Sequence, residues 1–465
     1  WRGGTNGEIH GVIDTQGRFL DDLGYLSGEI AGPLHFEGSV HFLHKEIGLA
    51  GRLTSPGVDL FGFHLDELAG QVTSGGPRIS SLGLALERAV FAGGPVAGTF
   101  DVDFERPGPF ARLALQADGP QLQQVLQALD LPAPAFSASA HGELAYEFPL
   151  NDARRGVGSA SFALRALPPQ VAGALPVNGT AVLQLVEGRL ELQEVTLASA
   201  TQQVSLRGAY DLVGKQGELV VEVTSEDLGQ IARLQPFIET VPWPLWLPDS
   251  GRGGLTAAVA LAGPATTVQL ALDLADIHAP GGSAARATGS LTLDERAVRE
   301  LVIELTRDAA ALRVTGFVPL AATPPTPPLA LVIDFRAWPV AEAMPWLPAP
   351  LPLAGAATGS LRLGGSVDDM TGEMHGAVAP VTVAGVDFDR LETDLDWDTD
   401  RMRVHRLQLQ APSGLFAGRG ELRFADEALR FDLAAERLDL AAAPWQELTG
   451  GRLSGQAALT AVLTG

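Results

Sequence analysis

Four aspartates at alternate positions form the pattern in this sequence that most suggests metal chemistry. Asp394, Asp396, Asp398 and Asp400 have the carboxylate spacing of the first half of a calcium-binding loop. The glycine expected at the sixth position of such a loop and the glutamate expected at the twelfth are replaced by a threonine and a histidine. The residues between the aspartates alternate with them as in a β-strand. We therefore interpret the acids as the water-facing side of a strand and predict no metal site.

Three histidines, His35, His41 and His44, lie close together in the sequence and are the other candidate metal ligands. His41 and His44 are three residues apart, and this odd spacing places them on opposite faces of a strand. Such a pair cannot share one tetrahedral ion unless the chain turns between them. The favoured interpretation is three ordinary histidines of strand surfaces.

The sequence also lacks the common catalytic motifs. It has no Gly-x-Ser-x-Gly turn, no P-loop and no Rossmann glycine fingerprint, and the glycine-rich stretch 251–254 leads into a β-pattern. The formal charge is −23, from 32 basic and 55 acidic residues, so the chain offers no basic stripe for phosphate groups. We predict a protein that is not an enzyme, uses no cofactor and binds no nucleic acid.

A period of two residues dominates the chain. Apolar and polar residues alternate over 100–105, 143–148, 218–223 and 391–398, for example. Because successive side chains of a strand point to opposite faces, each segment has one apolar and one water-facing side. Parallel sheets covered on both faces would instead give continuous apolar runs. The pattern, punctuated by glycine- and proline-rich turns, predicts an all-β protein built on a long antiparallel sheet.

Four short segments depart from this alternation and are predicted to be helical. They start near residues 118, 227, 337 and 439, and a proline follows each start. A strand motif that opens with glycine recurs at positions 98, 208, 316 and 420, at intervals of 110, 108 and 104 residues. Markers that keep one order and one period indicate long internal repeats. The predicted repeats are residues 1–117 (partial), 118–226, 227–336, 337–438 and the start of another at 439–465.

Three stretches of the sequence resemble the TamB/AsmA-like superfamily of bacterial envelope proteins. They are the apolar-x-apolar-Asp-x-Leu strand at 386–391, the turn and strand at 411–422, and the helix opening at 225–228. The resemblance covers most of residues 27–465. It implies a repeat sheet curled into a U-shaped hydrophobic groove with short helices at the rim, located in the periplasm between the inner and outer membranes. It also implies a segment that anchors the protein in the inner membrane and another that binds an outer-membrane β-barrel partner. Both segments would lie outside this sequence. We expect the sequence to be an internal piece of a longer protein.

The function implied by the resemblance is bridge-like transfer of phospholipids between the two membranes. Independently, moving a 16-carbon acyl chain through water exposes apolar surface worth on the order of 12 kcal/mol, and an apolar lane removes most of that barrier. Two alternatives remain open: a periplasmic scaffold or chaperone that holds outer-membrane strands by β-augmentation, and an array of closed β-sandwiches. The residues predicted to line the groove and contact acyl chains are Phe100, Val102, Phe104, Leu144, Tyr146, Phe148, Leu219, Val221, Val223, Leu331, Ile333, Phe335, Leu391, Leu395, Trp397, Leu422, Phe424, Phe431 and Leu433.

Overall fold

The protein is all-β, as the alternation predicts. The computed structural model describes residues 6–465 except 16–29, 44–45, 61–62, 76–79, 106–107, 129–135, 153–154, 170–173, 231–248, 263–264, 280–281, 295, 321–327, 344–352, 367–368, 384–385, 413, 440, 443–449, 451 and 453. Strands make up 81% of these described residues, and 28 strands form one open antiparallel sheet. The fold matches the expected long curled β-groove with few helices.

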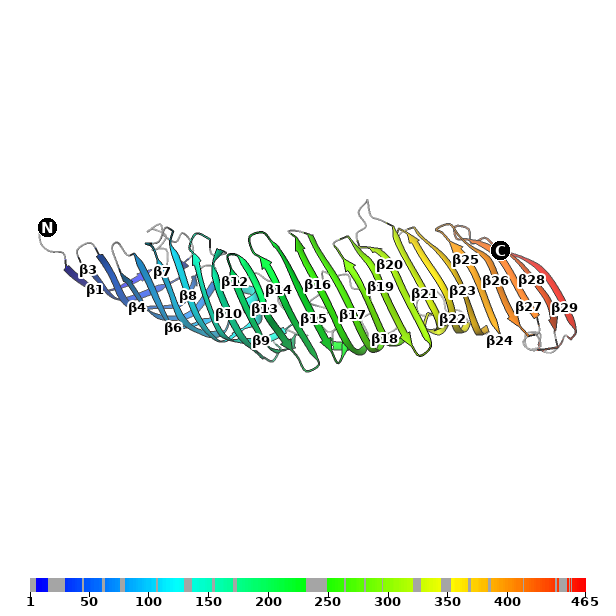
Figure 1. Ribbon diagram of the computed structural model, residues 1–465, viewed down its shortest axis with the longest axis horizontal. Helices are drawn as coiled ribbons and strands as arrows, with labels where there is room; N and C mark the ends of the chain where they lie inside the picture. The colour runs from blue at the N-terminus through cyan, green and yellow to red at the C-terminus, as the bar shows by residue number, and fades with distance from the viewer. Residues whose placement is uncertain are drawn as a thin grey trace. The chain divides into compact units, whose positions relative to one another are not determined.

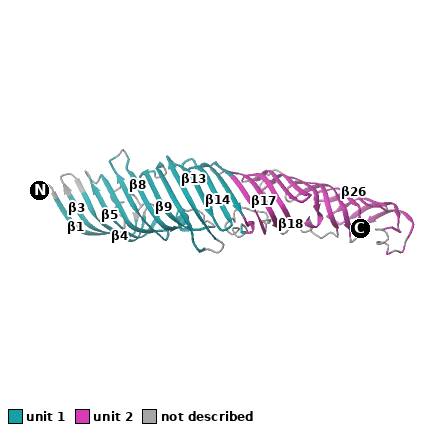
Figure 2. Cartoon of the chain, turned by 60° about the horizontal axis from the view of Figure 1, so that its bottom comes forward, with its two compact units in different colours: residues 1–225, 230–242, 258–264 teal, residues 226–229, 243–257, 265–465 magenta. Residues whose placement is uncertain are grey.

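The chain divides into two compact units, which are coloured separately in Figure 2. The first contains β1 (Asn6–Thr15), β2 (Ile30–Ala31), β3 (Leu34–Leu43), β4 (Glu46–Leu60), β5 (Phe63–Gly75), β6 (Ser81–Phe91), β7 (Gly94–Asp103), β8 (Phe110–Gln121), α2 (Leu122–Ala128), β9 (Phe136–Pro149), β10 (Val157–Ala166), β11 (Leu175–Pro176), β12 (Asn178–Val186), β13 (Arg189–Ala198), β14 (Gln202–Asp211) and β15 (Gln216–Ser225).

The residues of β16 (Ser250–Ala262) are divided between the two units. The second unit continues with β17 (Ala265–Ala279), β18 (Gly282–Leu293), β19 (Ala297–Arg307), β20 (Ala310–Pro319), β21 (Leu329–Pro339), α3 (Val340–Ala343), β22 (Leu353–Gly365), β23 (Met370–Val383), β24 (Val386–Phe388), β25 (Arg390–Trp397), β26 (Arg401–Ala411), β27 (Gly414–Arg423), β28 (Leu429–Asp439) and β29 (Gln456–Thr464).

Most strands pair in antiparallel fashion with the strand that follows them in the chain, which gives the meander drawn in Figure 1. The short β11 differs, because it pairs in parallel with the start of β9. Tight turns support the meander. At Ala92–Gly93 and Glu187–Gly188 both central residues have positive φ, the geometry of a two-residue type I′ hairpin.

The predicted helical segments are only partly helical. The first forms α2 and the third forms α3, whereas the second is a short 3-10 turn at 228–230 whose continuation lies outside the described residues. At the fourth, residues 441–442 form a turn and a bend, so the prediction of a helix is wrong for that part. Short apolar stretches that follow a strand are too brief to sustain a helix without tertiary support.

The recurring glycines share a position opposite a β-bulge in the preceding strand. Gly98, Gly208 and Gly316 adopt φ of 155°, 147° and 142°, a region that favours glycine. In each case the register of the preceding strand shifts beside the glycine's partner, as it also does opposite Gly420. A bulge bends the strand and increases its twist, so the marker recurs where the sheet must curve. The boundaries of the repeats themselves stay a prediction.

Candidate functional site: the apolar face of the sheet

In the first unit, one face of the sheet carries an unbroken series of apolar residues. We call a series of directly opposed residues on successive strands a row. Because opposed residues share a face, the register identifies the members of a row without ambiguity. One row from β6 to β15 consists of Leu84, Phe100, Leu113, Tyr146, Gly158, Leu185, Leu190, Tyr210 and Gly217.

The second unit has the same arrangement. One row from β18 to β29 consists of Gly289, Ile303, Val314, Ile333, Leu361, Met374, Leu395, Val404, Gly420, Phe431 and Leu463. No member of either row carries a charge. In each unit, therefore, apolar residues cross the strands. We call the row, together with the residues two and four positions away from it on the same face of each strand, the apolar lane, and the side that bears it the apolar face.

The structure places the predicted lining residues of each unit on this apolar face, with one difference. Phe424 lies in the turn after β27 and is 45% exposed, because that strand ends one residue earlier. Phe104 directly follows the end of β7 and packs beside Val102 and Phe148. These last two are buried, at 2% and 7% exposure, and so act as core.

The burial of the side chains on the apolar face varies along each strand. Buried clusters lie near the strand ends, such as the one formed by Val381, Phe388, Ala411, Ala435 and Leu438. Between the ends, lane residues such as Val221, Ile333 and Leu395 are only half-buried. The middle of each strand therefore keeps apolar surface that the described protein does not cover.

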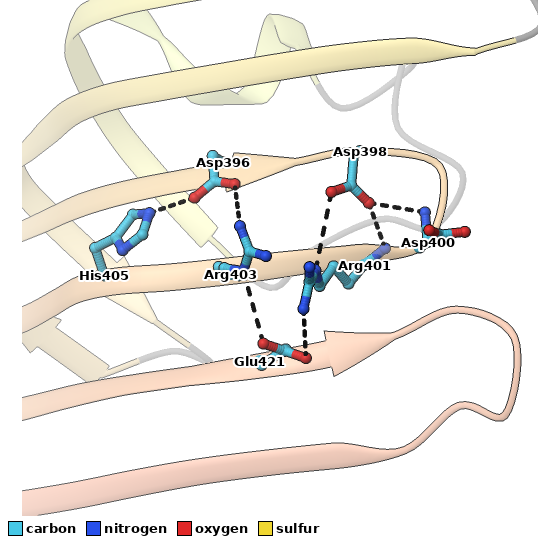
Figure 3. Close-up of polar contacts among 7 residues, drawn as sticks. All are labelled: Asp396, Asp398, Asp400, Arg401, Arg403, His405 and Glu421. Carbon is cyan, nitrogen blue, oxygen red and sulfur yellow. Dashed lines mark hydrogen bonds and ion pairs between the residues drawn. The ribbon is translucent and has the colours of Figure 1, made fainter.

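The opposite, polar face carries many ion pairs. Figure 3 shows Asp396 between His405 and Arg403, and Glu421 bound by Arg403 and Arg401 at 3.7 Å each. The Asp398 carboxylate accepts backbone N–H bonds from Asp400 (2.8 Å) and Arg401 (3.0 Å), which lower its pKa, and it also pairs with the Arg401 guanidinium at 3.9 Å. In the described part of the chain, no group of three or more metal-type ligands has the geometry to hold an ion.

Changing the aspartates of this polar network is expected to leave the apolar lane intact. Asp396→Asn removes the ion pairs with Arg403 and His405, and surface pairs of this kind contribute about 0–1 kcal/mol each because water screens them. We expect unchanged thermal unfolding within about 3 °C, with or without added calcium. A calcium-dependent rise in melting temperature that Asp394→Asn abolishes would contradict this expectation.

Histidines on the polar face bind carboxylates rather than one another. His35 contacts Asp14 at 2.7 Å and His41 contacts Glu8 at 3.4 Å, while His44 lies outside the described residues. Two open hollows of about 700 and 540 Å³ also lie on the polar face, away from the apolar lane. They are open to water and lined mostly by polar side chains and small residues.

His64 provides a test of pH dependence. Its bond to Asp59 at 2.8 Å raises the pKa of the imidazole above its usual value of 6.5. A raised pKa in the folded state adds stability below pH 6.5, and this contribution is lost as the pH rises through the folded pKa. His64→Gln is therefore expected to destabilise the protein slightly at pH 5.5, by less than about 1 kcal/mol, and not at pH 9. Urea unfolding at both pH values measures the difference, and equal losses at both would contradict it.

Many residues of the lane are absent from the set predicted from the sequence. Leu113, Leu185, Val314 and Met374 lie in the same rows as the predicted ones. Gly372 and Gly376, which flank Met374 on the same face, weaken the apolar signal there, and bulges reset the alternation elsewhere. A cross-strand register, which sequence alone does not provide, was needed to find them.

Neither the scan against protein-family models nor the search of curated proteins finds a match for this chain. Among the described residues, no helix has the length and apolar character needed to span a membrane.

Proposed function

We propose that the protein transfers phospholipids without catalysis, by letting acyl chains slide along the apolar lane while headgroups stay in water. One observation carries the proposal: rows of uncharged, mostly half-buried side chains cross the strands of each unit, and no second layer of described residues covers that face. Moving an acyl chain through water costs about 0.8 kcal/mol for each exposed methylene, and contact with the lane offsets most of that cost.

The proposed place of action is the periplasm, between the inner and outer membranes. There a lipid must cross water, and a lane of this kind supplies the apolar contact that water lacks. The resemblance of residues 386–391 and 411–422 to TamB/AsmA-like proteins supports this location.

Lipid that co-purifies with the protein tests the proposal directly. We expect native mass spectrometry of the chain, expressed in a diderm bacterium, to find bound phospholipid that detergent removes. The purified chain should then accelerate transfer of a fluorescent phospholipid between liposomes. Lipid-free protein that also fails to accelerate transfer would refute the proposal.

A further inference from the structure

Aromatic side chains on the apolar face lie over glycines of the neighbouring strand. A methyl group built on Gly158 would lie 2.7 Å from Tyr146 Cδ2, and one built on Gly217 would lie 2.8 Å from Tyr210 Cδ2. Each ring therefore occupies the space of the missing side chain. We call these contacts glycine–aromatic pairs, and the directly opposed ones are Gly158–Tyr146, Gly217–Tyr210, Gly372–Trp397 and Gly420–Phe431.

At the pair Gly372–Trp397 the aromatic ring alone occupies the space of the missing side chain. At the other three glycines an added methyl group would also meet a backbone oxygen of the neighbouring strand, so backbone crowding by itself requires glycine there. At Gly372 the three nearest atoms all belong to the Trp397 indole, which an added methyl group would overlap. Gly372 is buried beneath the indole, whereas the indole itself is only half-buried.

Glycine in a strand interior is otherwise unfavourable, because it weakens the strand and gives no side chain to pack. A ring that covers it restores that packing and then lies flat along the sheet. Any larger residue at Gly372 would push the indole outward into the space above the sheet. The glycine therefore sets how far the aromatic ring projects from the apolar face.

We propose that the Gly372–Trp397 pair is a contact site for a straight acyl chain. The chain lies against the flat face of the indole, and the glycine determines how far that face stands above the sheet. This inference rests on the proposed function and names the ligand class at one position of the lane. Side chains on one face of a strand repeat every two residues, about 6.8 Å apart. One hydrocarbon chain, whose contacts with carbon lie at about 3.5–4.0 Å, can lie on the flat face of the Trp397 ring and against Leu395, the next side chain on the same face of β25.

The test uses the whole chain with Trp397 as its single tryptophan, the other six being replaced by phenylalanine. The probe is a phosphatidylcholine with dibrominated stearoyl chains, because bromine quenches indole fluorescence on contact. We expect this lipid to quench Trp397, and the unbrominated lipid not to. Gly372→Val should weaken the quenching and slow lipid transfer by about fivefold, since overpacking displaces the ring.

Thr371→Val is the matched control, because the neighbouring residue faces the polar side and is exposed. It should change neither readout. If Gly372→Val disturbs the circular dichroism, Gly372→Ala is used instead, because it moves only the indole. Equal quenching in the Gly372 variant and the control would overturn this inference. Lipid transfer without any quenching would overturn it too, and would leave the proposed function standing. Absence of quenching, of transfer and of bound lipid would refute both.

Discussion

Val221→Asp is expected to slow lipid transfer by about a hundredfold while the fold survives. Val221 stands in the apolar lane opposite Leu206, and an aspartate there would place an ionised carboxylate against hydrocarbon without a partner. The penalty for such a contact is several kcal/mol, and about 2.8 kcal/mol already corresponds to a hundredfold. In the lipid-free protein the half-buried position lets water reach the carboxylate. The substitution therefore lowers the folding stability less than it raises the barrier to lipid transfer.

Val220→Asp provides a matched control, because the neighbouring valine lies opposite Arg207 on the polar face. It adds the same charge to the same strand and should leave transfer within about twofold, since a surface charge of this kind is screened. A liposome assay with a fluorescent phospholipid measures both variants.

The second unit offers the same comparison. Ile333→Asp and Leu395→Asp should each block transfer, whereas Val332→Asp, on the polar face opposite Thr315, should not. If all three lane variants kept full transfer, these residues would not line a lipid path.

Phe388→Ala is expected to destabilise the second unit by about 3–4 kcal/mol. The ring is 6% exposed and packs with Val381, Ala411 and Leu438 in a buried cluster near the strand ends. Removing a buried phenylalanine loses its transfer free energy and leaves a cavity that the strands fill only partly.

Phe424→Ala is the control for this prediction, because the same ring is removed from a turn where it is 45% exposed. Its expected cost is below about 0.5 kcal/mol. Hydrogen exchange of the β23–β28 amides measures the free energy of local opening. This measurement is valid even if the repeats unfold one after another. A similar loss in both variants would mean that the cluster does not hold the sheet together.

Much of the fold follows from local pattern. Val221 and Leu395 each stand among residues that alternate in polarity, and one face of an isolated strand is then apolar whatever its neighbours are. The same alternation separates the aspartates at 394–400 from the lane and places Asp396 beside Arg403 and His405 on the polar face. Alternation over segments such as 218–223 and 391–398 argues against a parallel sheet covered on both faces, which would give continuous apolar runs there.

Other features depend on contacts between distant residues, and only the tertiary structure decided them. Gly372 and Trp397 are 25 residues apart, and the register of β23 with β25 sets one against the other. Bulges such as the one between Phe335 and Trp338 change which residues face the lane. The turn that removes Phe424 from the strand depends likewise on where β28 begins. Alternation assigns a residue to one of two faces, but cross-strand pairing chooses its neighbours and the strand ends, because those hydrogen bonds join segments that no local pattern connects.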